Sequence, residues 1–232
     1  MPRMAHPNAF DGLPPLYHSY SLFGVENPHI NDHYAKNQQS KQPILLAYIQ
    51  YAIAKCKARI ADEVSFAELF CADGFYAMAA LHLGATSSLG IDNGRDVHSR
   101  RMTDIAQRLG LNVEFAKMDA HDVAVLPPVD IVANVGGLYH VADPETALDA
   151  SYAYARRFLI VQTVVSLGNQ SPDYFEAPAP GWTWGSRYSR QSWERTLAAK
   201  GWRIVDQHFN RLEGNGRRED AGSCYALIAK GR

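Results

Sequence analysis

Acidic side chains recur at the ends of three predicted strands, where they are suited to binding a ligand. Glu68, Asp92 and Asp119 occupy these positions, in chain order. Because the carboxyl ends of parallel strands meet at one edge of a sheet, we expect the three to converge there. An ionised carboxylate accepts hydrogen bonds from both hydroxyls of a ribose, which suits Asp92, or from an adenine amine, which suits Asp119. Ala72 and Gly74 allow close backbone approach, and the helix beginning near Gly74 directs free N–H groups at a ligand.

Candidate catalytic residues lie after the fourth predicted strand and near the start of the chain. His140 has a side chain whose ordinary pKa suits proton acceptance near neutral pH, and Tyr139 beside it can orient a substrate. Tyr17 and His18 lie in a proline-containing segment that we expect to fold over a ligand as a lid. The aromatic segment 174–188 is a candidate substrate wall, through Tyr174, Phe175, Trp182, Trp184, Arg187 and Tyr188.

The elements that must position these residues alternate along the chain. Apolar periodicity predicts strands and helices in turn, which favours a doubly wound, mostly parallel α/β sheet with an antiparallel C-terminal hairpin. The expected strands are 65–70, 87–92, 111–119, 129–135, 158–165, 202–213 and 223–230. The expected helices are 43–61, 73–84, 96–110, one opening at Asp143-Pro144 and one capped by Ser189. We therefore expect an N-terminal arm over 1–42 and a single α/β domain over 43–232.

Composition narrows the range of functions. The 232 residues include 23 Lys+Arg and 24 Asp+Glu, for a formal net charge of −1, which disfavours a broad nucleic-acid surface. No apolar run approaches the roughly 20 residues of a membrane span, and the start lacks the apolar stretch of a secretory signal. Cys56, Cys71 and Cys224 are widely spaced and predict neither disulfides nor a metal site. We therefore expect a cytoplasmic protein without a membrane partner.

Residues 64–141 resemble the class I S-adenosylmethionine-dependent methyltransferases. ELFCADG (68–74) is similar to the family's first, glycine-rich motif, commonly DLGCGxG, and GID (90–92) to its ribose-binding acid. MDA (118–120) is similar to the adenine-edge motif, and VDIVANVGGLYHVADPE (129–145) to the fourth motif. The resemblance implies a Rossmann-like sheet of seven strands. YHS (17–19) and GLYHVADP (137–144) also resemble a subgroup related to wobble-uridine tRNA methyltransferases.

The resemblance implies S-adenosylmethionine as the cofactor and a set of residues that bind it. Glu68 would fix the loop or reach the methionine ammonium, Asp92 would bind the ribose, and Asn93 would meet the adenosine edge. The remaining contacts would come from Cys71, Ala72, Gly74, Asp119, Ala120, Asn134 and Val135. Phe70 and Ala72 depart from the motif, because they replace its first and second glycines.

The sequence supports three hypotheses about the function. The favoured one is methyl transfer to an oxygen of a small molecule or glycan, with His140 accepting the proton. The alternatives are modification of a nucleobase in tRNA, against which the neutral net charge counts, and a non-catalytic module that binds S-adenosylmethionine. A nicotinamide dehydrogenase is disfavoured, because no G-x-G-x-x-G turn is present. The oligomeric state and the acceptor stay open.

Overall fold

The computed structural model describes residues 6, 8–60, 63–95, 98–181 and 183–231. Its strands within these ranges are β1 (Ser65–Leu69), β2 (Ser87–Asp92), β3 (Glu114–Lys117), β4 (Val129–Val135), β5 (Ala155–Ser166), β6 (Phe175–Glu176), β7 (Arg187–Ser189), β8 (Arg203–Arg211) and β9 (Gly222–Ala229). Its α-helices are α1 (Asp32–Ile60), α2 (Phe75–His82), α3 (Met102–Arg108), α4 (Pro144–Tyr154) and α5 (Arg190–Ala199).

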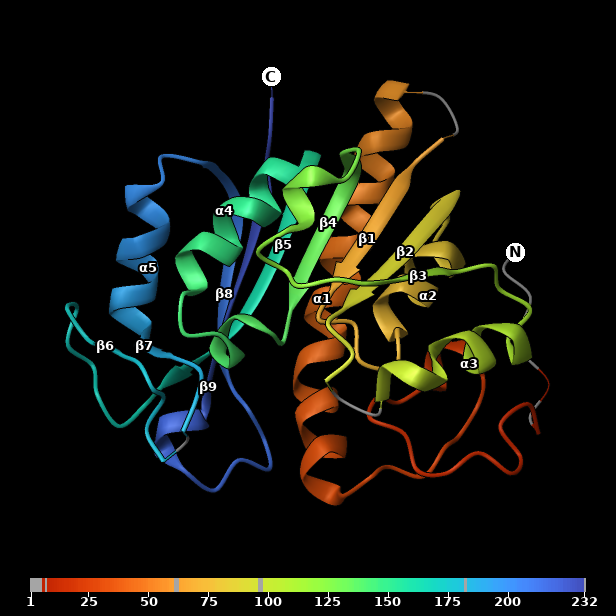
Figure 1. The fold of residues 1–232 in the computed structure, drawn as a ribbon, viewed down its shortest axis with the longest axis horizontal. Coiled ribbons are helices and arrows are strands. Elements are labelled where there is room, and N and C mark those ends of the chain that lie inside the picture. The colour runs from red at the N-terminus through yellow and green to blue at the C-terminus, as the bar shows by residue number, and fades with distance from the viewer. Residues whose placement is uncertain (1–5, 7, 61–62, 96–97, 182, 232) are drawn as a thin grey trace.

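Seven of these strands form one layer in the order β3-β2-β1-β4-β5-β9-β8. The first five are parallel, while β9 pairs antiparallel with β5, from Phe158 opposite Ala229 to Val165 opposite Gly222. Strand β8 completes the predicted hairpin with β9. The predicted mostly parallel seven-stranded sheet with an antiparallel C-terminal hairpin is therefore confirmed. It brings the ends of β1, β2 and β4 to one edge, at the lower side of Figure 1.

Two short strands extend the sheet beyond this prediction. Strand β7 pairs parallel with the end of β5, where Val165 faces Tyr188, past the point where the pairing with β4 stops. Strand β6 pairs antiparallel with β7. The aromatic segment after β5 therefore turns back on the sheet, so that its aromatic residues lie at the same edge as the strand ends.

Two apolar cores pack on the two faces of the sheet. On one face, alternate residues of β4 and β5 such as Ile131 and Ile160 pack with the inward sides of α1, α2 and α3. On the other face, Val132 and Val161 pack with α4 and α5. In Figure 1, α4 and α5 lie on one side of the view and α2 and α3 on the other. Helices on both faces are what the near-continuous apolar strands predict.

Helix α1 begins eleven residues before the predicted start at 43. The Pro43 ring lies inside the helix instead of opening it. Contacts with the end of β8 and the loop after it account for this difference: the Asn37 amide donates to the Glu213 carbonyl at 2.7 Å, and the Asn210 amide donates to the Ser40 carbonyl at 2.8 Å. These partners lie 170 and 176 residues away in sequence, and they outweigh the local preference against proline in a helix.

The other predicted helices match the structure with shifted ends. The helix expected over 96–110 is a 3-10 turn, His98–Arg101, followed by α3, and residues 96–97 lie outside the described residues. The Asp143 side chain accepts a hydrogen bond from the Thr146 backbone and caps α4 as expected. Ser189 caps α5 in the same way. None of the described helices is long and apolar enough to cross a membrane.

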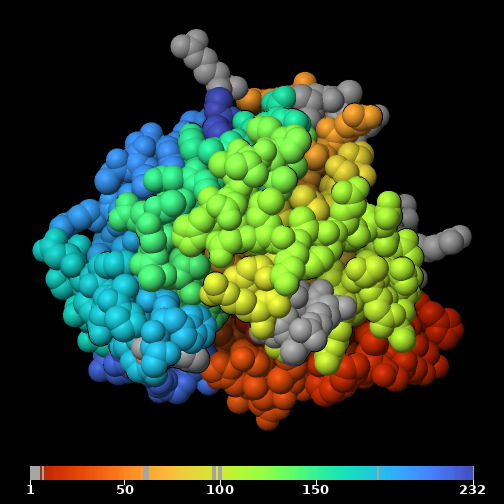
Figure 2. Space-filling view, viewed as in Figure 1, coloured from red at the N-terminus to blue at the C-terminus, as the bar shows by residue number. Residues whose placement is uncertain are grey.

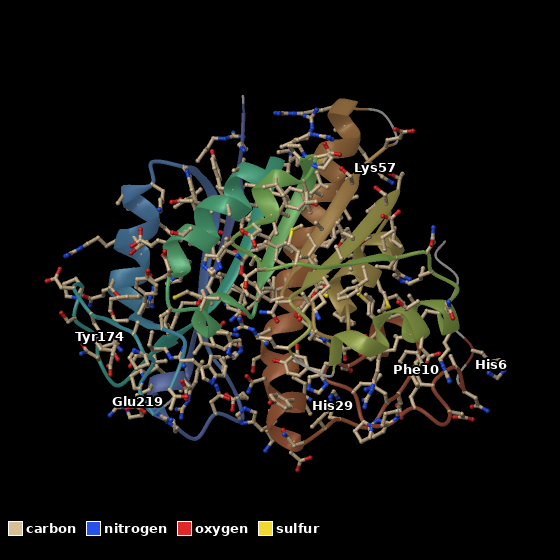
Figure 3. All side chains as sticks on the ribbon, viewed as in Figure 1. His6, Phe10, His29, Lys57, Tyr174 and Glu219 are labelled. Atoms are coloured by element: carbon tan, nitrogen blue, oxygen red, sulfur yellow. The ribbon has the colours of Figure 1, made fainter. Side chains whose placement is uncertain are left out.

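The N-terminal arm is part of the first core. Tyr20, Phe23 and Leu16 are at most 2% exposed. The rings of Tyr20 and Phe23 meet Phe75, the first residue of α2, edge-on at 5.4 and 6.1 Å. Figure 3 labels Phe10 and His29 on this arm, at the lower end of the molecule. The arm is therefore packed against the start of α2, directly beside the loop that follows β1.

Candidate active site

The loop after β1 adopts a left-handed backbone at three alternate residues. Phe70, Ala72 and Gly74 have φ values of 56°, 47° and 80°. Only glycine adopts this region freely, and another residue pays about 1–2 kcal/mol. The loop therefore keeps the backbone of a glycine-rich turn although two of its three glycines are replaced. Such strain persists only where the surroundings fix it, and it is concentrated at functional sites.

Hydrogen bonds to α2 and to β2 hold this loop. The Glu68 carboxylate accepts from the Ala77 backbone N–H at 2.7 Å, and burial raises the pKa of Glu68 well above its ordinary value. The Cys71 backbone N–H donates to the Ile91 carbonyl at 3.2 Å. The Cys71 thiol is fully buried, so only its backbone faces the sheet edge. The Glu68 carboxylate therefore joins the end of β1 to the first turn of α2.

The Phe70 ring lies flat against the loop after β4. A Cβ built on Gly137 would come within 1.9 Å of Cγ of Phe70, so the ring occupies the place of a Gly137 side chain. The ring also packs against the second apolar core. Phe70 therefore joins the loops after β1 and β4 at the edge of the sheet.

Exchanging Gly137 for alanine tests this contact. Gly137 has no left-handed backbone, so alanine suits its conformation and only the Phe70 ring opposes it. We expect Gly137→Ala to lower the free energy of unfolding by about 3 kcal/mol, measured by urea denaturation. In a Phe70→Ala background the same exchange should cost less than about 1 kcal/mol. If Gly137→Ala lowered the free energy of unfolding equally with and without the Phe70 ring, the ring would not lie against Gly137.

The carboxylates at the ends of β2 and β3 are partly exposed beside this loop. Asp92 accepts from the Gly94 backbone at 2.8 Å and from the Ala72 backbone at 3.4 Å, which ties it to the strained turn. Asp119 accepts from the His121 backbone at 3.1 Å and meets its Nδ1 at 2.6 Å. The hydrogen bond from His121 lowers the pKa of Asp119, which keeps the group ionised.

The neighbours of these carboxylates complete the edge. Asn93 is partly exposed, and its side-chain oxygen accepts from the Arg95 backbone at 3.1 Å. Ala120 is 5% exposed. Asn134 is turned away from the edge, because its amide donates to the Ser151 hydroxyl of α4 at 2.8 Å. At the end of β4, Val135 faces the first core, so backbone groups remain there for a ligand.

The arm is fastened to the loop after β1 through Asp73, a residue that the sequence did not single out. The carboxylate of Asp73 accepts the backbone N–H groups of Tyr17 and His18 at 2.9 and 3.1 Å, and it contacts the His18 ring. The Tyr20 hydroxyl donates to the Asp73 carbonyl at 3.0 Å. Because the His18 ring is 4% exposed and contacts Asp73, it helps to hold the arm in place. No local pattern pairs residues 55 positions apart.

The other predicted catalytic residues gather above the end of β4. Tyr139 receives a hydrogen bond from Tyr17, and burial raises the pKa of Tyr139 to about 12. The Arg187 guanidinium lies 5.4 Å from the centre of its ring. His140 is exposed, and its ring lies 4.9 Å from that of Trp184. The segment 174–188 therefore meets the predicted catalytic pair, as expected of a substrate wall; Trp182 lies outside the described residues.

Figure 2 shows how these parts meet on one face of the molecule. The loop after β2 (yellow) lies between the arm (red) and the segment after β5 (cyan). Among the described residues, no group of three His, Cys, Asp or Glu side chains is arranged to hold a metal ion.

Solved structures similar to this one include a methyltransferase, a domain with bound S-adenosylhomocysteine and a cyclase. The magnesium protoporphyrin IX methyltransferase ChlM from Synechocystis PCC 6803, with bound S-adenosylmethionine, has a TM-score of 0.64 at 11% identity, over 88% of this chain and 86% of that chain. The N-terminal domain of EvdMO1 with bound S-adenosylhomocysteine has a TM-score of 0.62 at 21% identity, over 97% and 94%. The [4+2]-cyclase SpnF has a TM-score of 0.59 at 18% identity, over 87% and 84%. No protein-family model and no curated protein sequence matches the chain.

The chain thus has the class I S-adenosylmethionine-dependent methyltransferase fold, as the sequence resemblance implied. At these sequence identities the similarity concerns the fold alone. The cyclase shows that this fold supports more than one reaction, so the fold by itself does not define the reaction of this chain.

Proposed function

We propose that this chain is an enzyme that transfers a methyl group from S-adenosylmethionine to an oxygen of a small molecule or glycan. The observation that carries the proposal is the loop after β1, which keeps three left-handed residues at 70, 72 and 74 although two of the usual glycines are replaced. A strained turn is retained where its backbone has a task. Beside it, the partly exposed Asp92 and Asp119 carry the acceptor oxygens that an adenosyl group requires.

The residues present fit the cofactor. Asp92 would bind the ribose hydroxyls, Asn93 the adenosine edge, and Asp119 with Ala120 the adenine. Glu68, Cys71, Ala72 and Gly74 would hold or form the turn that the cofactor approaches, and Asn134 and Val135 would offer backbone groups. The bound cofactor supplies an electrophilic methyl group on a sulfonium. The Phe70 ring is directed at Gly137 and the second core, which leaves the turn at Ala72 partly exposed.

The protein's part in the reaction is to orient the acceptor, exclude water and take a proton. A hydroxyl acceptor must lose its proton on methylation, and the exposed imidazole of His140 would accept it. The hydrogen-bonded pair of Tyr17 and Tyr139 would orient the acceptor, with Trp184 as the apolar wall. His18 would act through the arm rather than on the substrate.

A small-molecule or sugar acceptor is supported by the aromatic wall. The EvdMO1 domain was also crystallised in the presence of S-adenosylhomocysteine and D-fucose, at 19% identity and a TM-score of 0.63. A tRNA acceptor is the alternative. Lys55, Arg59 and Arg203 line a cleft of about 410 Å³, but they lie at the opposite end of α1 and of the strands from the proposed site.

Calorimetry with S-adenosylmethionine and S-adenosylhomocysteine tests the proposal. We expect one molecule of either ligand to bind per chain, and methyl transfer to be detectable with a panel of sugar acceptors. Binding without transfer to sugars, other small molecules or tRNA would favour the non-catalytic module. A chain that binds neither ligand would overturn the proposal.

The role of His140 makes a separate prediction. We expect His140→Ala to reduce turnover about 100-fold, because the acceptor proton loses its base, and to leave the affinity for S-adenosylhomocysteine unchanged. The matched control is His208→Ala, on β8, which should keep full turnover. Unchanged turnover in His140→Ala would remove His140 from the mechanism.

A further inference from the structure

One side of α1 faces the sheet along the helix, but its residues change from apolar to polar. Leu45, Ile49 and Ala52 on this side are fully buried in the first core. At 3.6 residues per turn, Lys41 and Gln38 are the next members of the same stripe toward the helix start. They are 3% and 0% exposed. Two polar side chains thus continue an apolar stripe at the end of α1 near the proposed site.

Neither side chain has a bonding partner in the part of the chain that is described. Both the amide oxygen and the amide nitrogen of Gln38 are buried without a hydrogen bond. No described residue hydrogen-bonds or ion-pairs with the Lys41 ammonium, and burial lowers the pKa of Lys41 to about 8. Buried polar groups are almost always bonded in folded proteins, and an unpaired buried charge is particularly unfavourable. A ligand with an anionic oxygen would satisfy both donors.

The position of Lys41 indicates which part of a ligand it would meet. Its charge acts on His18, whose ring is bound to Asp73 in the loop after β1. The neighbouring Gln42 amide donates to the Ser19 carbonyl at 3.1 Å. Lys41 therefore lies next to the arm where the arm is fastened to the strained turn.

A hydrogen-bond acceptor without a partner lies on the sheet, on the face that α1 covers. Gln162 of β5 faces the α1 side, and its side-chain oxygen is buried without a hydrogen bond. A Cβ built on Gly136 would lie 3.9 Å from both this oxygen and the Tyr139 hydroxyl. Tyr34, at the start of the α1 stripe, has its ring 4.8 Å from that of Tyr17, the partner of Tyr139. The start of α1 thus provides the donors Lys41 and Gln38, and β5 provides the acceptor Gln162, around Tyr17 and Tyr139.

We propose that Lys41 and Gln38 bind the carboxylate at the amino-acid end of S-adenosylmethionine. An α-amino acid carries a carboxylate, which needs donors, and an ammonium, which needs an acceptor such as the Gln162 oxygen. The inference rests on the proposed function, because it assigns new residues to the same ligand. It also explains why polar groups occupy the inward stripe of α1 at this end alone.

Two ligands that differ in the amino-acid end test this assignment. S-Adenosylhomocysteine carries that end, whereas 5′-methylthioadenosine has the same adenosyl group and sulfur without it. We expect Lys41→Met to weaken S-adenosylhomocysteine binding about 100-fold in calorimetry and to leave the affinity for 5′-methylthioadenosine unchanged. Methionine keeps the buried stem of the side chain without its charge, so the thermal unfolding temperature should not fall. The matched control is Lys36→Met, an exposed lysine on the same helix, which should change neither affinity.

The outcomes separate this inference from the proposed function. Equal weakening of both ligands, or no change in either, would overturn the role of Lys41 while adenosyl binding stands. If the unaltered chain binds neither ligand, the inference and the proposed function both fail. A selective loss of S-adenosylhomocysteine affinity is the supporting result.

Discussion

Replacing Asp92 with alanine is expected to weaken S-adenosylhomocysteine binding at least about 100-fold. In the proposed complex the carboxylate accepts hydrogen bonds from both ribose hydroxyls, and hydrogen bonds to a charged group contribute about 1.5–3 kcal/mol each. The loss of the pair corresponds to two or more orders of magnitude in the dissociation constant. Titration calorimetry measures this directly.

Asp92 also supports the turn, so the experiment needs matched variants. Its oxygens accept the backbone N–H groups of Gly94 and Ala72. Asp92→Asn keeps one acceptor oxygen and should weaken binding less than alanine does. Asp122→Ala, an exposed aspartate after β3, should bind normally. If Asp92→Ala is folded by circular dichroism and binds as tightly as the unaltered chain, the adenosyl site is not at this edge.

Replacing Asp73 with alanine is expected to cost about 3–5 kcal/mol of unfolding free energy. The carboxylate is 1% exposed and bonds to His18 and to two backbone N–H groups of the arm. Removing it leaves these buried donors without a partner, which is the costly way to break such a contact. Urea denaturation measures the loss, and proteolysis should then cut within the arm. Asp11→Ala, an exposed aspartate of the same arm, is the control and should cost less than about 0.5 kcal/mol.

The pH dependence of stability should report the same contact. Burial lowers the pKa of His18, so stability falls once the pH drops below the ordinary histidine range near 6.5. The pKa of Asp73 is lowered by His18 and the arm N–H groups despite its burial, so its contribution is complete above its ordinary value of 3.8 and is lost below it. Asp73→Asn should therefore show a shallower loss between about pH 4 and pH 2. An unchanged acid limb would contradict the assignment.

The sheet could be predicted from the sequence because its signals are local. The strand 158–165 is a continuous apolar run, and Gly110 stops the helix before β3, so a mostly parallel sheet with helices on both faces followed from the alternation of elements. The early start of α1 could not be predicted, since it depends on contacts of Asn37 and Ser40 with the end of β8 and the loop after it. Local rules place proline at a helix start, and tertiary contacts overrode them here.

The site was predictable in outline for the same reason. The strand-end carboxylates Asp92 and Asp119 follow from where the strands stop. In contrast, the left-handed backbone of Phe70 and Ala72 could not be predicted, because only glycine adopts that region freely. Contacts with neighbouring segments of the folded chain hold these two residues there. Asp73 and Gln38 were missed, since each matters through a partner or a position that only the folded chain brings together.

The pinning of α1 has a consequence for synthesis on the ribosome. Asn37 and Ser40 are held by residues 210–215, which leave the exit tunnel 170 or more residues after them. Until these residues appear, the first third of α1 lacks its anchors, and the stripe bearing Gln38 and Lys41 has no fixed orientation. The nascent chain can form the five parallel strands in order, but its ligand corner is completed only after β8 and the loop that follows it have emerged.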